Sequence, residues 1–122
     1  KVGGKVAVDE VWVTIDAGTV VNPDRARAQM EGSVIFGMNL ALHGGVDFAQ
    51  GRPVQSNFHD LKLLRIGDAP RKIHVTLVES ARPPSGVGEP GVPPVAPALA
   101  NAYFALEGKR LRDLPFGRAF GI

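Results

Sequence analysis

The chain has 122 residues, a length typical of one domain, and its composition of 44% hydrophobic and 21% charged residues is that of an ordinary globular protein. The fourteen Lys and Arg residues are scattered and the formal net charge is only +2, so nucleic-acid binding has little support. The absence of cysteine excludes disulfides, thiolate nucleophiles and iron–sulfur ligation by these residues. No apolar run approaches the roughly 18 residues needed to span a bilayer.

A strand is predicted first, because residues 6–15 are rich in β-branched and aromatic types. Alternation along this segment places Val11, Val13 and Ile15 on one face, which we expect to be the core face.

A helix is predicted next, with Asn22 as its N-cap and Pro23 at its first position. The pattern ends at Gly44. Gly32 and Gly37 lie inside it, and each costs about 1 kcal/mol relative to Ala, so we expect a close packing contact at these positions. Small or apolar residues recur at helical spacing: Ala26, Met30, Val34, Gly37 and Ala41.

The second half contains a hairpin, a strand and a helix. Residues 46–56 predict a hairpin that turns at residues 50–52, and residues 72–79 alternate as a half-buried strand does. A loop rich in Pro and Gly follows over residues 82–97, with a well-specified path when folded. It leads into a helix that Gly108 ends. The order predicts an α+β fold, a small sheet of about four strands packed with two helices, in one domain over 1–122. Apolar residues at helical spacing form a stripe along the last predicted helix: Val95, Ala98, Leu99, Ala102 and Leu106.

Glu89 is the first candidate for chemistry. It precedes Pro90 and Gly91, a sequence typical of a type II turn in which Glu89 would be solvated. Alternatively, the stiff loop presents one carboxylate in a closed pocket, where it would serve as a base in proton transfer. Gln29 has two interpretations as well. It either bonds water at the helix boundary or directs its amide at a ligand beside Gly32.

A metal site built from side chains of this chain is not predicted. His43, His59 and His74 lack the spacing of metal ligands, and no phosphate-binding loop of either standard pattern is present.

Two blocks of residues, taken in order, resemble a known family. The chain resembles the C-terminal region of the molybdenum-cofactor-binding subunit in the xanthine dehydrogenase and aldehyde oxidase family, and the bacterial isoquinoline 1-oxidoreductase beta subunit type fits best. The resemblance covers nearly the entire chain. The first block comprises Ile15-Asp16-Ala17-Gly18, Val21-Asn22-Pro23 and Gln29-Met30-Glu31-Gly32, and the second comprises Gly86-Val87-Gly88-Glu89-Pro90 and residues 95–102.

The resemblance implies roles for three residues in a fragment of the molybdopterin-binding domain. Glu89 would be the catalytic base beside molybdenum. Gln29 would contact the pterin cofactor, and Gly88 would let the loop approach the metal. The metal itself would be held by the pterin, in a nucleotide form that the sequence leaves open, and other parts of the cofactor site would lie upstream of residue 1.

The resemblance also implies a reaction and partners. The whole subunit would hydroxylate an N-heteroaromatic or aldehyde carbon with oxygen derived from water, and iron–sulfur clusters would lie on a partner chain. The isolated fragment is expected to be inactive, and its compartment, cytoplasmic or periplasmic, stays open. An alternative is a non-catalytic α+β assembly module that retains the family fold and uses exposed strand edges to associate.

Overall fold

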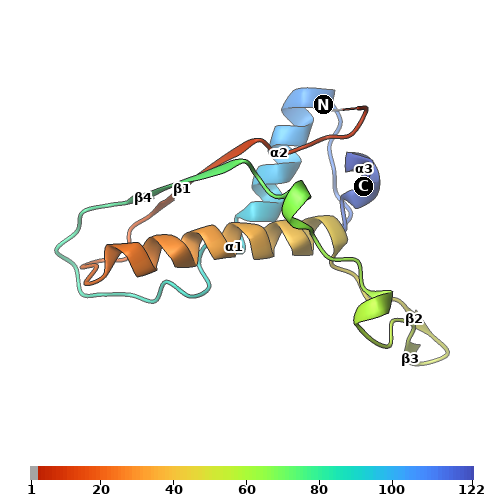
Figure 1. The fold of residues 1–122 in the computed structure, drawn as a ribbon, viewed down its shortest axis with the longest axis horizontal. Coiled ribbons are helices and arrows are strands. Elements are labelled where there is room, and N and C mark those ends of the chain that lie inside the picture. Colours follow the sequence, from red (N-terminus) through yellow and green to blue (C-terminus); the bar gives the residue numbers. More distant parts are fainter. Residues whose placement is uncertain (1–2) are drawn as a thin grey trace.

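The computed structural model describes residues 3–122 and confirms the α+β class (Figure 1). A long helix lies along a pair of strands, and a shorter helix crosses its C-terminal half. None of the described helices is long and apolar enough to cross a membrane. In chain order the principal elements are β1 (Glu10–Ile15), α1 (Pro23–His43), β2 (Phe48–Ala49), β3 (Arg52–Pro53), β4 (Lys72–Leu77), α2 (Val95–Glu107) and α3 (Gly117–Phe120), with two 3-10 turns at Phe58–Asp60 and Ile66–Asp68.

The four described strands form two sheets, where the sequence suggested one. β1 pairs in parallel with β4, in a register that runs from Glu10 opposite Lys72 to Ile15 opposite Leu77. β2 and β3 form a separate antiparallel hairpin that projects from the end of α1 (Figure 1). Its turn has positive φ at Gln50 and Gly51, and this local closure leaves the hairpin paired only with itself.

Helix α1 begins and ends where the sequence predicts. The Asn22 side chain accepts a hydrogen bond from the backbone N–H of Arg25 at 3.1 Å, Pro23 occupies the first turn, and Gly44 ends the helix. These features satisfy an otherwise unpaired amide at the N-terminus, where the Pro23 nitrogen has no hydrogen to donate.

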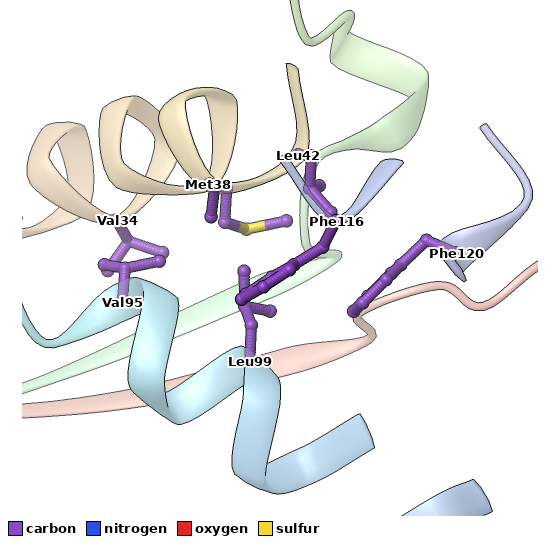
Figure 2. Close-up of a cluster of buried hydrophobic side chains, with 8 residues drawn as sticks. Val34, Met38, Leu42, Val95, Leu99, Phe116 and Phe120 are labelled. Atoms are coloured by element: carbon purple, nitrogen blue, oxygen red, sulfur yellow. The ribbon is translucent and has the colours of Figure 1, made fainter. Parts of the chain in front are cut away.

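The core lies between α1, α2 and α3. Figure 2 shows Val34 of α1 facing Val95 of α2, while Leu99 and Phe116 pack below Met38. Helix α3 was not expected from the sequence, because it is a four-residue turn too short to show a periodic pattern. The buried cluster consists of Val34, Met38, Ala41, Leu42, Val95, Leu99, Phe116 and Phe120.

The two glycines inside α1 have different surroundings. A Cβ on Gly37 would stand 2.7 Å from Cγ2 of Val95 and 3.0 Å from the carbonyl oxygen of Val92. The close packing expected there is therefore confirmed, since only glycine lets α2 approach α1 this closely. At Gly32, by contrast, a Cβ would meet no atom within 4 Å. The expectation of close packing is wrong for Gly32 within the described chain.

Candidate functional site

The loop over residues 82–94 is clamped to the first motif block. It leaves β4, passes around the N-terminal end of α1 and enters α2 (Figure 1). The backbone N–H of Ser85 donates to the carbonyl of Ala17 at 2.9 Å. Gly18 has a φ of +69°, and a side chain there would overlap the carbonyl oxygen of Pro83. Only glycine therefore fits where the loop crosses the first block.

A second anchor lies at the other end of the loop, where Gly91 is buried against α1. A Cβ on Gly91 would stand 2.6 Å from Cβ of Ser33, so the missing side chain is what allows the contact. The backbone N–H of Val92 donates to the carbonyl of Glu89 at 3.0 Å, which closes a turn with Pro90 and Gly91 at its centre. This turn is not type II, because Gly91 has no positive φ. Gly91 is required for space and not for its φ angle.

Between the two anchors, the loop brings the second motif block beside Gln29. The Nε2 atom of Gln29 lies 4.0 Å from the position that a Cβ on Gly88 would take. Ser33, one turn along α1, donates its hydroxyl to the Gln29 carbonyl at 2.8 Å and is itself buried. Sequence reasoning did not identify Ser33, because a serine inside a helix gives no sign of what packs on it.

The exposed residues around Gln29 and Gly88 leave room for a ligand. Gln29, Gly32, Gly88 and Glu89 are all exposed, and we call these four residues the two-block surface. Within the described residues, the Gln29 amide and the Glu89 carboxylate make no hydrogen bond or ion pair. A Cβ on Gly32 would meet open space, and so would one on Gly86. The surface combines an amide, a carboxylate and backbone that a flat or bulky group can approach closely.

Among the described residues, no group of three or more His, Cys, Asp and Glu side chains could hold a metal ion. His43, His59 and His74 lie on different elements: α1, the 3-10 turn Phe58–Asp60 and β4. A metal at the two-block surface would therefore need to be held through another group, as it is in cofactors that carry their own ligands.

A second cluster of charged side chains ties β1 to β4 and is structural. The Nε2 atom of His74 lies 2.6 Å from a carboxylate oxygen of Glu10, and Arg71 contacts both Glu10 and Asp9. The hydrogen bond from His74 holds the pKa of Glu10 below its ordinary value. The Trp12 ring stacks on His74 with centroids 4.9 Å apart. These contacts run across the β1–β4 pair and help to hold the two strands in register.

His43 lies at the other end of α1, beside a cavity of about 650 Å³ that Lys62, Lys109 and Arg118 also line. Partial burial, followed by the charge of Lys62, lowers the pKa of His43 from its ordinary value of 6.5. The uncharged imidazole is therefore favoured at this position in the folded chain.

Known proteins resemble this chain in sequence. Residues 2–70 match the family model described as a molybdopterin cofactor-binding domain; Gln29 lies within this range, whereas Gly88 and Glu89 lie beyond it. The chain is 43% identical over 110 residues to isoquinoline 1-oxidoreductase subunit beta of Brevundimonas diminuta, and this match covers 90% of the chain and 14% of that protein. It is 39% identical over 112 residues to the membrane-bound aldehyde dehydrogenase (pyrroloquinoline-quinone) of Gluconacetobacter polyoxogenes, covering 92% and 14%.

A solved structure shares the fold. Quinoline 2-oxidoreductase from Pseudomonas putida 86 superposes with a TM-score of 0.72 at 22% identity, over 86% of this chain and 14% of that one. The chain thus spans about one-seventh of the length of these relatives. The resemblance that the two motif blocks carry is confirmed, and the chain belongs to the family of molybdopterin cofactor-binding domains.

Proposed function

We propose that this chain is one domain, the C-terminal part of the catalytic subunit of a molybdenum hydroxylase. In this proposal Gln29 and Gly88 contact the pterin cofactor and Glu89 acts as the base. The observation that carries the proposal is the packing of the second motif block on the first, which puts Gly88 beside the Gln29 amide. Residues some 60 positions apart in sequence thereby share one exposed surface.

The residues of the two-block surface fit a pterin cofactor. Its heterocycle presents both donors and acceptors, which a primary amide such as that of Gln29 can match. The open backbone at Gly32 and Gly88 lets a large planar group approach without meeting a side chain. In this proposal the metal is carried by the pterin and needs no ligand from these residues.

Glu89 is suited to receive a proton by the rigidity of its loop. The anchors at Ser85 and Gly91 fix the backbone on both sides of it, so the point from which its side chain extends is held in place. Glu89 is exposed in the described chain, and in this proposal the remainder of the subunit encloses it. The molybdenum–pterin group supplies the redox chemistry when it is bound. The protein's part is to take a proton from the water that provides the oxygen atom.

The substrate and partners follow from the relatives. The relatives include an isoquinoline 1-oxidoreductase and an aldehyde dehydrogenase, so we propose an N-heteroaromatic compound or an aldehyde as substrate. The remainder of the subunit and an iron–sulfur partner chain complete the enzyme. One relative is named for pyrroloquinoline quinone, but the family model that matches describes a molybdopterin domain, and we therefore propose molybdenum.

A non-catalytic assembly module is the second candidate. The solvent exposure of Glu89 favours it, as do two exposed aromatic side chains: Phe48 of the hairpin is 73% exposed, and Phe58 in the 3-10 turn that follows the hairpin is 81% exposed. Such a module would bind partners through these surfaces and would need no carboxylate at position 89.

Glu89→Gln in the full-length subunit with its partner chain separates the two candidates. The variant keeps the shape of the side chain and removes its basicity. We expect molybdenum and pterin content equal to wild type, with turnover per molybdenum lowered roughly 10²- to 10⁴-fold. Glu79→Gln is the matched control, since Glu79 is an exposed glutamate that precedes the loop and lies outside the two-block surface. Near-normal turnover in Glu89→Gln, or a preparation that contains no molybdenum, would contradict the proposal.

A further inference from the structure

A groove of about 930 Å³ opens between β1 and α2. One wall is the N-terminal stretch 6–14, which includes most of β1, and the opposite wall is α2. No described residue of β4 lines the groove, so it lies along the edge of β1 that faces away from β4. The lining is mainly apolar, and outside β1 it includes Val34, Met38, Val95, Ala98, Leu99, Ala102 and Leu106.

The backbone of β1 along this edge can accept another strand. The carbonyls of Asp9 and Ile15, which flank and end the strand, receive hydrogen bonds from the β4 side at 2.8 and 2.9 Å. Backbone groups of successive residues point to opposite edges of a strand. Those of Glu10, Trp12 and Thr14 therefore point toward the groove. Within the described residues β1 has β4 as its one neighbour, and an unpaired edge of this kind is a template for strand addition.

Helix α2 supplies an uncovered apolar face opposite that edge. Of its apolar stripe only Val95 and Leu99 are buried, whereas Ala98 and Ala102 are exposed and Leu106 is 54% exposed. Strand β4 packs on α1, and among the described elements no strand packs closely on α2, which leaves this part of α2 without a covering layer. The apolar stripe of a helix is normally buried against another element, so the exposed part of this stripe indicates that a further element covers it.

We propose that an extended apolar strand from the remainder of the same polypeptide occupies this groove. It would pair with the open edge of β1 and pack its inward side chains on Ala102 and Leu106 of α2. The match covers only 14% of each of the two curated relatives, so most of their length lies outside it and is available to supply the strand. Two strands alone make a marginal sheet. A third strand beside β1 would extend the sheet, so that it covers α2 as well as α1. The inference rests on the proposal that this chain works within a longer subunit.

Photo-crosslinking in the full-length subunit tests which segment occupies the groove. A benzophenone amino acid replaces Ala102, and a mixture of light and isotope-labelled heavy subunits separates crosslinks within one chain from those between copies. We expect Ala102 to crosslink to a segment of its own polypeptide outside residues 1–122. Asn101 is the control position because it is exposed and does not line the groove. Crosslinks between light and heavy chains would identify a second copy as the occupant and overturn the proposal. Equal yields from both positions, or none from Ala102, would also overturn it.

Hydrogen exchange on the unmodified subunit gives a second test that no bulky probe can disturb. Val11 and Val13 serve as internal references because their amides point toward β4. We expect the amides of Trp12 and Thr14 to exchange at least about 100-fold more slowly than unprotected amides, as the references do. Fast exchange at Trp12 and Thr14 beside protected references would overturn the proposal. Neither measurement reads turnover, so the result at Glu89 and the result at this groove can fail separately.

Discussion

Alanine substitution at the two glycines of α1 should change stability in opposite directions. At Gly32 a Cβ enters open space, so Gly32→Ala gains only helix propensity and should stabilise the chain by about 1 kcal/mol. At Gly37 the same atom would stand 2.7 Å from Cγ2 of Val95 and 2.8 Å from its Cβ. No rotamer moves the Cβ of Val95, so α1 and α2 must separate. Overpacking of this kind costs about 1 to 3 kcal/mol and offsets the propensity gain.

Urea unfolding of the 122-residue chain, followed by far-ultraviolet circular dichroism, measures both effects. We expect the midpoint to rise for Gly32→Ala and to fall for Gly37→Ala. A midpoint for Gly37→Ala at or above that of wild type would refute the packing argument. In the full-length subunit, Gly32→Ala should lower the cofactor content although it favours the helix, because the methyl group occupies the two-block surface. Unchanged cofactor content would remove Gly32 from that surface.

The remaining predictions concern the loop and two titrating groups. Gly91→Ala forces a Cβ to 2.6 Å from that of Ser33, so it should lower thermal stability and loosen the loop, seen as faster proteolysis there. Glu10→Gln should destabilise the chain at neutral pH, since His74 lowers the pKa of Glu10; the difference should shrink as the pH falls below the ordinary glutamate value of 4.5, measured by urea unfolding against pH. Burial lowers the pKa of His43, so stability should decline below pH 6.5, and His43→Gln should flatten that decline.

Local signals in the sequence predicted both ends of α1 and the end of α2, whereas the strand predicted over residues 6–15 begins only at Glu10. Asn22 and Pro23 mark the start of α1, and Gly108 ends α2 with a φ of +67°. Each of these signals acts through the backbone of its own turn, so it can be recognised without knowledge of the tertiary structure. The α+β class followed from the order of these elements.

Contacts between distant segments could not be predicted in the same way. The sequence predicts Gly91 as a turn residue, and the structure shows in addition that its missing side chain lets the loop approach Ser33. Gly32 and Gly37 have the same local context of a helix interior, and only the position of α2 distinguishes them. The hairpin was expected to join the sheet of β1 and β4, but it forms a sheet of its own. A periodic pattern identifies a strand but not the strand with which it pairs.

The candidate site was predicted in part, through the family resemblance. The two motif blocks named Gln29, Gly88 and Glu89 through a family resemblance, and the structure brings the first two together. The base role of Glu89 stays a prediction, since its carboxylate is exposed within the described residues.

The dependence of kcat/KM on pH, measured for the wild-type full-length subunit and for Glu89→Gln, tests the central claim most directly. A base must be deprotonated to act, so wild-type activity should fall toward low pH. We predict that the residual activity of Glu89→Gln lacks this fall and is flat across the same range. An acid limb of the same position and steepness in both proteins would show that another group accepts the proton, and it would contradict the role assigned to Glu89.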